Sequence, residues 1–336
     1  MGTFCRSVWF PHCKMGNGYA KQKKNKMVAR RGLHCRTLRT IGITEHQIKK
    51  EMEEHISLGV DIGGTHITAA LVDVKAGTVI PETTKRSKID SNASASQIVF
   101  DWCKVIAQTI QGTNYSGKMA IAMPGPFDYE NGISHMTGMG KYESLYEQNV
   151  RSLMLQQLGQ KISRIDFFND AACFLQGELA YGEASAHQKV FGLTLGTGFG
   201  TALGTAGVAK DADYWRHPFM GGICEDFFSS KWFTSQYEKC AGRAVKNVKD
   251  LIDHIEVANP LLQVFDEFSI NLSTFLSRIH KKDQFSCVVI GGNISNASSL
   301  FLPQLKYHLQ SMNTPVSIYI SSKGEDAALI GAANSI

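Results

Sequence analysis

Short apolar runs and longer amphipathic segments alternate along the chain after about residue 55. The short runs are rich in Val, Ile and Phe, which is typical of buried strands; they cover 57–62, 118–122, 164–168, 189–195 and 285–290. The longer segments predict helices over 95–111, 144–158, 171–181 and 325–333, and a further helix that starts at Asn259-Pro260. Alternation of strands and helices predicts an α/β fold.

Two of the strands run through glycines directly into a second β-rich run. The run at 57–62 reaches Gly63-Gly64-Thr65 and continues over 66–74, and the run at 189–195 reaches Gly196–Gly200 and continues over 201–204. Strand, glycine turn and strand predict a hairpin rather than the strand-to-helix step of a P-loop. Because the pattern returns after about 135 residues, we expect a duplicated α/β unit with a cleft between the copies.

Charge and composition suggest the domain organisation. Residues 1–50 hold 12 of the 35 Lys and Arg residues and one acidic residue, so the remainder is net acidic although the whole chain carries +5. We expect residues 1–51 to be a disordered basic extension; a transit peptide, a nucleic-acid-binding arm and an upstream start codon with the native product beginning near Met52 are the alternatives. The remainder is expected to form domains over 52–168 and 169–324, with a helix over 325–336 packing back on the first.

Apolar runs and cysteines indicate the compartment. No stretch approaches the 18 or more apolar residues of a membrane span, so a soluble chain without a membrane partner is expected. The five cysteines after residue 100 are scattered and form no CxxC pair, which favours a reducing, cytoplasmic setting and no structural zinc.

Three glycine segments suggest nucleotide binding. Asp61-Ile-Gly-Gly-Thr65 places a carboxylate beside a turn whose backbone can approach a polyanion, and a divalent cation between the two would make the aspartate tolerable. Each segment alone also fits an ordinary turn. In this order, however, the first turn, Gly196-Thr-Gly-Phe-Gly200 and Gly291-Gly292 predict a nucleotide held from two domains.

Asn169-Asp170 follows a short apolar strand, where α/β folds commonly carry functional groups. Asp170 is a candidate general base that accepts a proton from an attacking hydroxyl, with Asn169 orienting the acceptor. The alternative is that Asp170 only caps the helix over 171–181.

Together these motifs resemble those of the ROK sugar kinases, glucokinase-like members of the actin-like ATPase superfamily. The matching segments, over about 55–336, read LGVDIGGTHITAALVD, MPGPFDYENGIS, FFNDAACFLQGE, LTLGTGFGTAL, VVIGGNIS and GEDAALIGAA. The resemblance implies two RNase H-like domains with an interdomain cleft, and a homodimer. It also implies ATP and Mg²⁺ as cofactors and a hexose as substrate.

The resemblance also assigns residue roles. Asp170 becomes the base on the sugar 6-hydroxyl, while Asn169 holds neighbouring hydroxyls. Phosphate and magnesium fall to Asp61 (through water for the metal), Gly63, Gly64, Thr65, Gly196, Thr197 and Gly198. The adenosine is flanked by Gly291, Gly292 and Asn293.

One region departs from the family pattern. Many members carry a Glu-x-Gly-His segment and a cysteine-rich zinc loop after the second phosphate motif, and only 24 residues separate Gly200 from Glu225 here. Glu225 matches the glutamate after the lost loop and is expected to contact the sugar; a helix glutamate favoured by the dipole is the alternative. Asp213 or His217 are candidate substitutes for the missing pair, and the loop 138–146 is expected to line the sugar.

The sequence therefore predicts ATP-dependent phosphorylation of a hexose, glucose or a relative, at its 6-hydroxyl. A sugar-responsive transcriptional regulator of the same family is the alternative function. It would need a winged helix, for which residues 1–50 look too short and aperiodic, and nucleic-acid binding is not expected. A third possibility is a nucleotide-binding protein without turnover, against which the intact Asn169-Asp170 argues.

Overall fold

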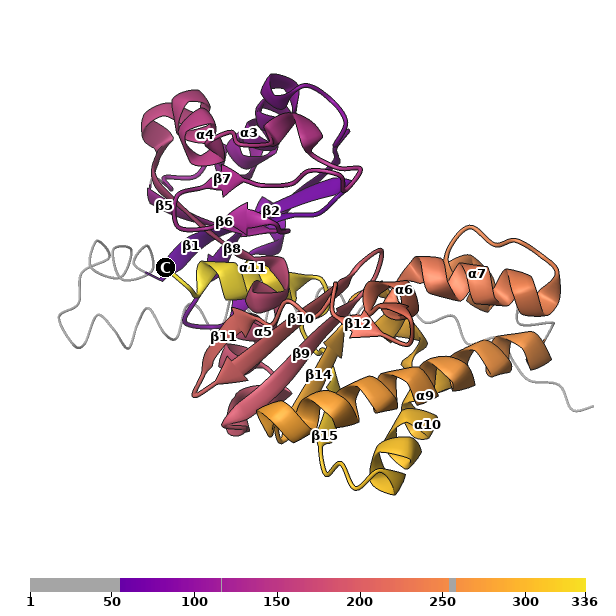
Figure 1. The fold of residues 1–336 in the computed structure, drawn as a ribbon. Helices are drawn as coiled ribbons and strands as arrows, with labels where there is room; N and C mark the ends of the chain where they lie inside the picture. Colours follow the sequence, from indigo (N-terminus) through magenta and orange to yellow (C-terminus); the bar gives the residue numbers. More distant parts are fainter. Residues whose placement is uncertain (1–54, 116, 254–257) are drawn as a thin grey trace, which may run out of the picture. The chain divides into compact units, whose positions relative to one another are not determined.

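The computed structural model describes residues 55–336 except 116 and 254–257 (Figure 1). The expectations about residues 1–51 concern residues outside this part. Within it, no helix is long and apolar enough to cross a membrane.

The first sheet has six strands and the order β3-β2-β1-β5-β8, with β4 also pairing β2. Its β1–β2 hairpin is antiparallel and turns at the first glycine segment, whereas β1, β5 and β8 are mutually parallel. The strands are β1 (Ile56–Ile62), β2 (His66–Asp73), β3 (Thr78–Val79), β4 (Lys85–Lys88), β5 (Gly117–Met123) and β8 (Ile162–Asn169).

The second sheet repeats this plan with five strands in the order β11-β10-β9-β14-β15. Again the hairpin strands β9 and β10 are antiparallel, and β9, β14 and β15 are parallel. The strands are β9 (Lys189–Leu195), β10 (Phe199–Thr205), β11 (Val208–Asp211), β14 (Cys287–Gly291) and β15 (Ser317–Ile320). The predicted hairpins, and their repetition, are confirmed.

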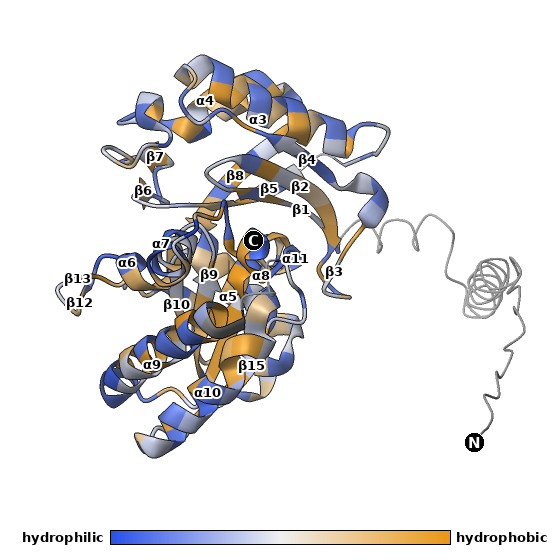
Figure 2. Ribbon diagram, turned by 90° about the vertical axis from the view of Figure 1, so that its right-hand side faces the viewer, coloured by the Kyte–Doolittle hydropathy of each residue, from blue (hydrophilic) through white to orange (hydrophobic). Residues whose placement is uncertain are grey.

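The helices lie on both faces of these sheets (Figures 1 and 2). Buried residues of α3 and α4 pack on one face of the first sheet, and those of α9 and α10 on one face of the second. Between the sheets, α5 packs on β9 and β10, and α11 on β1, β5 and α5. The helices are α3 (Ala95–Ile110), α4 (Val150–Leu158), α5 (Asp170–Tyr181), α6 (Glu225–Phe228), α7 (Ser230–Ala241), α8 (Val248–Asp253), α9 (Ala258–Asp283), α10 (Ser298–Ser311) and α11 (Asp326–Ala333).

Short elements complete the described residues. Two small hairpins pair β6 (Phe127–Asp128) with β7 (Ile133–Ser134), and β12 (Pro218–Phe219) with β13 (Gly222–Ile223). The 3₁₀ turns are η1 (Pro81–Thr83), η2 (Glu143–Leu145), η3 (Gly159–Lys161), η4 (Glu183–Ala186) and η5 (Asn293–Ala297).

The predicted helices agree with the observed ones to within one residue at the predicted ends, except for the helix over 144–158. The helix expected over 144–158 is split into η2 and α4, because Glu147 has a φ of 59° and the Asn149 side chain caps α4 by accepting the Ser152 N–H. The helix expected to start at Asn259-Pro260 already includes Ala258. Pro260 is tolerated there because the first helical turn leaves its N–H groups unpaired.

Alternation along β1 decides which side chains point toward which layer. Leu58, Val60 and Ile62 are buried among the residues of α3 and α4. Successive side chains of a strand face opposite sides, so Gly59 and Asp61 face the layer that holds α5 and α11. A Cβ on Gly59 would collide with the backbone of Leu329 in α11, which confirms this direction.

Candidate active site

The predicted catalytic residues lie at one edge of the first sheet. Since β1, β5 and β8 are parallel, their carboxyl ends meet at the same edge. Asp61 pairs with Ala122 of β5, and Met123, the next residue of β5, pairs with Asn169 of β8. Asp61 and Asn169-Asp170 therefore sit two strands apart at this edge, although 108 positions separate Asp61 from Asn169 in the chain.

Asp61 and Asp170 share a poorly hydrated environment. Burial, followed by the negative charge of Asp170, raises the pKa of Asp61 from 3.8 to about 7. Burial also raises the pKa of Asp170, and the positive charge of Lys141 partly offsets that rise. A carboxylate with a raised pKa is a stronger base than an exposed one, which suits the role expected of Asp170.

Asn169, and not Asp170, is the cap of α5. Its Oδ1 accepts the Ala172 N–H at 2.9 Å, and its Nδ2 donates to the Tyr129 hydroxyl at 3.3 Å. Asp170 is the first residue of the helix, and its Oδ1 accepts the adjacent Ala171 N–H at 2.9 Å. The interpretation of Asp170 as the N-cap is thus wrong, because the side-chain amide of Asn169 already accepts the hydrogen bond that an N-cap residue accepts from the first turn of the helix.

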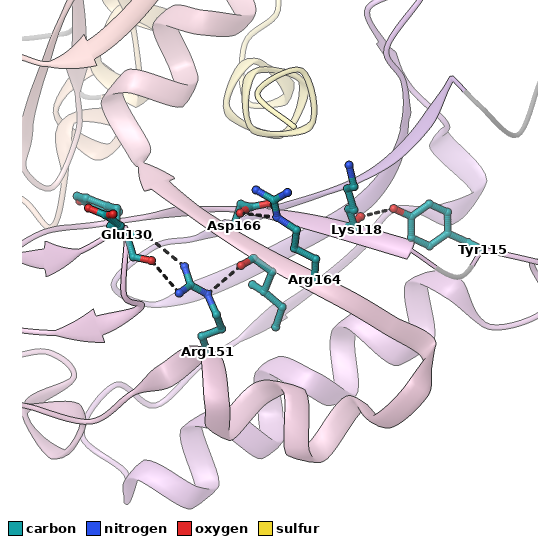
Figure 3. A network of polar contacts seen from close by, with 8 residues as sticks. Tyr115, Lys118, Glu130, Arg151, Arg164 and Asp166 are labelled. Carbon is teal, nitrogen blue, oxygen red and sulfur yellow. Dashed lines mark hydrogen bonds and ion pairs between the residues drawn. The ribbon is translucent and has the colours of Figure 1, made fainter.

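Tyr129 and Arg151 hold Asn169 in place, and neither residue was predicted from the sequence. The Tyr129 hydroxyl donates to the Met123 carbonyl at 3.1 Å, and burial raises the pKa of this phenol. The Arg151 guanidinium donates to the carbonyls of Ile165 at 3.0 Å, Glu130 at 2.8 Å and Tyr129 at 3.3 Å (Figure 3). Arg151 thereby ties the Tyr129 segment to β8, the strand that ends in Asn169.

The first glycine turn is covered by the loop 138–146. Within the turn, the Gly63 N–H donates to the His66 carbonyl at 2.9 Å, and the Tyr142 hydroxyl donates to the Gly63 carbonyl at 2.6 Å. A Cβ on Gly64 would lie 3.5 Å from Cδ of Lys141. Thr65 is exposed, and its hydroxyl lies 2.8 Å from Nδ1 of His66. The loop expected to line the sugar therefore also packs on the turn expected to bind phosphate.

The second glycine turn lies beside the start of α5. Its ends are joined by a hydrogen bond from the Gly196 N–H to the Gly198 carbonyl at 3.1 Å, and Thr197 at its tip is exposed. A Cβ on Gly200 would lie 3.1 Å from Cβ of Ala171, the residue after Asp170. This contact brings the second hairpin to the predicted base.

The third glycine segment packs directly on the second. Gly291 pairs with Thr194 of β9, and Gly292 has a φ of 82°. A side chain on Gly292 would collide with the backbone of Leu195, so the close approach requires glycine. Asn293 then starts η5. The segments expected to hold phosphates and adenosine are thus neighbours in space.

Glu225 lies on the second glycine turn. Its Oε2 accepts the Phe199 N–H at 3.1 Å, a contact that the sequence analysis did not anticipate. The candidates for the lost sugar contacts have partners of their own: Asp213 pairs with Arg216 at 2.8 Å, and Nδ1 of His217 lies 3.3 Å from the Pro218 carbonyl oxygen. The expected sugar contact of Glu225 stays a prediction.

The described residues contain no group of three or more His, Cys, Asp or Glu side chains placed to hold a metal ion. Magnesium needs fewer protein ligands, because it keeps several waters and is commonly bound by one or two carboxylates plus phosphates. Asp61 fits that demand: it is a carboxylate beside a glycine turn, and the adjacent Asp170 disfavours its charge. A cation there would relieve the repulsion between the two carboxylates.

Two α/β sheets with the same strand order, each opened by a hairpin, define the actin-like ATPase class of fold. Residues 57–216 match the model of the ROK family. An N-acetyl-D-glucosamine kinase of Aliivibrio fischeri is 25% identical over 304 residues, which cover 82% of this chain and 97% of the relative. A glucokinase of Thermotoga maritima is 24% identical over 317 residues, covering 83% and 96%.

Solved structures give the same fold. A ROK family glucokinase from Streptomyces griseus in complex with glucose and AMPPNP superposes with a TM-score of 0.71 at 19% identity, covering 83% of this chain and 98% of that one. A ROK family transcriptional regulator, a homolog of the E. coli MLC protein, superposes with a TM-score of 0.68 at 16% identity, covering 83% and 77%.

Proposed function

We propose that this chain is an ATP-dependent kinase that phosphorylates a hexose, glucose or a related sugar, at its 6-hydroxyl. The names of the relatives, N-acetyl-D-glucosamine kinase and glucokinase, support a sugar acceptor. The proposal is carried by one observation: the carboxylate of Asp170 lies within electrostatic reach of Asp61 at the first glycine turn, and the adjacent Ala171 abuts the second hairpin.

In the proposed reaction Asp170 accepts the proton of the sugar 6-hydroxyl as its oxygen attacks the γ-phosphorus. A bond forms between the sugar oxygen and phosphorus, the bond from phosphorus to the β–γ bridging oxygen breaks, and ADP leaves with that oxygen. Phosphoryl transfer depends mainly on positioning and charge stabilisation, so one base is the only proton acceptor that the reaction needs from the protein. The amide of Asn169, held by Tyr129, is oriented to bind a neighbouring hydroxyl.

The phosphates and adenosine are assigned to the glycine segments. Backbone N–H groups of turns without side chains approach polyanions closely. We assign Gly63, Gly64, Thr65, Gly196, Thr197 and Gly198 to the phosphates and Gly291, Gly292 and Asn293 to the adenosine. Asp61 would hold Mg²⁺ through water, and this ion supplies charge neutralisation when bound. Glu225 is proposed to contact the sugar.

The test is a coupled ADP-release assay across glucose, mannose, fructose and the N-acetylhexosamines. Asp170→Asn keeps the shape of the side chain and removes the base, so kcat should fall roughly 100- to 10,000-fold. Glu183→Gln, on an exposed turn, is the matched control and should retain turnover. Wild-type turnover in the Asp170→Asn variant would refute the proposed base.

No described residue favours the regulator alternative, which requires a winged helix. A gel-shift assay at physiological salt, with and without residues 1–51, separates it from the kinase. The homodimer and the domain limits at 52–168 and 169–324 remain predictions.

A further inference from the structure

We propose that Lys141 is a further catalytic residue, whose ammonium group binds the phosphoryl group during its passage from nucleotide to sugar. This inference rests on the proposed kinase function and names the residue that supplies positive charge at the reaction centre. No motif of the sequence singles out this lysine, which lies within the segment Gly138–Tyr146.

The loop that precedes Lys141 is closed by a carboxylate. Glu143 accepts the backbone N–H groups of Gly138 at 3.0 Å, Met139 at 2.8 Å and Gly140 at 3.1 Å. These three bonds hold the backbone leading into Lys141 in one conformation, and they hold the pKa of Glu143 below its usual range.

The residue after Lys141 anchors the loop to the first glycine turn. Tyr142 is fully buried, and its ring packs edge-on against Trp102 with centroids 5.2 Å apart. Its N–H donates to the Ser91 carbonyl at 2.8 Å, and its hydroxyl donates to the Gly63 carbonyl at 2.6 Å. Lys141 is therefore fixed on both sides, as a preorganised site requires.

The side chain of Lys141 extends from the turn toward the base. Its Cδ lies 3.5 Å from the point where a Cβ on Gly64 would stand, so the stem crosses the first glycine turn. Its charge acts on the carboxyl group of Asp170. The stem of Lys141 thus lies on the turn proposed to bind phosphate, and its ammonium group lies within electrostatic reach of the group proposed to take the proton.

Lys141 is also free to bind an anion. Within the part of the chain that the structure describes, it makes no ion pair, although it is half-buried. Arg86, the cation that acts on Asp61, is by contrast paired with Glu325. Neither glycine turn contains a lysine or arginine. Lysine serves as a point charge for phosphate, and a nucleotide triphosphate at these turns needs such countercharge.

The experiment compares steady-state kinetics of wild type, Lys141→Met, Lys141→Gln and Lys141→Arg with the preferred hexose. Loss of one preorganised charge donor should lower kcat about 100-fold in Lys141→Met and Lys141→Gln. The KM of the sugar should stay near the wild-type value, and Lys141→Arg should recover a large part of kcat. Lys104→Met, on an exposed position of α3, is the matched control.

The outcomes separate this inference from the function on which it rests. Unchanged kcat in the folded Lys141→Met and Lys141→Gln variants, beside an active wild type, overturns the role of Lys141 alone. A defect confined to the KM of the sugar also overturns it, because it makes Lys141 a sugar-binding residue. Absence of hexose-dependent ADP release from the wild type overturns the proposed function together with the inference. Thermal unfolding of each variant shows that the comparison is between folded proteins.

Discussion

At the scale of single residues, the site combines two carboxylates in an environment that disfavours their charge. The pKa of Asp61 is raised to about 7 by burial and by Asp170. A folded-state pKa above the unfolded value of 3.8 means that the folded chain keeps a proton which the unfolded chain has lost. The free energy of unfolding is therefore unaffected by this group below about pH 4, and it decreases as the pH rises from 4 to 7.

This sign gives a testable prediction for Asp61→Asn. The amide cannot ionise, so at pH 8 the variant without nucleotide should have a free energy of unfolding about 4 kcal/mol above that of wild type. At pH 4 the two proteins should be equally stable. Urea denaturation at intervals between pH 4 and 8 measures both differences, with Glu183→Gln as control. A variant less stable than wild type at pH 8 would contradict the origin assigned to the raised pKa.

Site residues could be predicted from the sequence where the local pattern marks them. They could not be predicted where their role depends on partners that lie far away in the chain. Asp61, Asn169 and Asp170 are visible in the sequence because each ends an apolar run, and parallel strand ends meet at one edge. Tyr129 and Lys141 carry no such signal, since their roles arise only from contacts with Asn169 and with Gly64 that the fold creates.

At the scale of elements, α11 depends on unusually close packing. A Cβ on Gly177 of α5 would collide with the carbonyl of Ala327, and a Cβ on Gly331 of α11 would collide with the carbonyl of Cys173. Two helices can approach this closely only where the side chains are hydrogen atoms. Because α5 begins at Asp170, this contact also supports the predicted base.

Gly331→Ala should therefore cost both stability and turnover. Overpacking against the backbone of α5 is expected to lower the free energy of unfolding by about 1 to 3 kcal/mol, and kcat should fall as the start of α5 is displaced. Gly324→Ala is the matched control: its φ is 57°, and an added Cβ would meet no atom within 4 Å. The control measures the conformational cost alone, about 1 kcal/mol. Equal losses in the two variants, measured by thermal denaturation, would contradict the packing argument.

Both hairpins and about half of the helices were predictable from the sequence, and the remaining elements were not. Both hairpins, α3, α5 and the buried stripe of α9 follow from apolar spacing. The split between η2 and α4 was missed because the positive φ of Glu147 and the cap at Asn149 are local backbone events inside a continuous helical pattern. Strand β15, helices α7, α8 and α10, and the order of the strands in either sheet were not predicted. The pairing of β14 between β9 and β15 is a long-range property that no local pattern shows.

At the scale of the whole molecule, the proposed nucleotide site draws on both sheets. The first turn joins β1 to β2, the second joins β9 to β10, and Ala171 of α5 contacts the second hairpin. A nucleotide that binds both turns makes contacts that exist only while both sheets are folded. Binding to the folded state alone raises the free energy of unfolding by RT ln(1 + [L]/Kd).

Mg-ATP should consequently stabilise the whole unit of residues 55–336 in a single transition. At a free concentration about 100 times the Kd, the gain is about 2.7 kcal/mol. Trp102 lies in the core beside the first sheet and Trp232 in the core beside the second, so single-tryptophan variants that retain one or the other report on each sheet separately. The unfolding transitions reported by the two tryptophans should shift to higher temperature together.

Removal of Mg²⁺ with EDTA should reduce the shift, because phosphate charge would then face Asp61 and Asp170 without a cation between them. If only one tryptophan responds, the nucleotide binds to one sheet and the assignment of the opposite turn is wrong; if EDTA has no effect, Asp61 does not hold the metal.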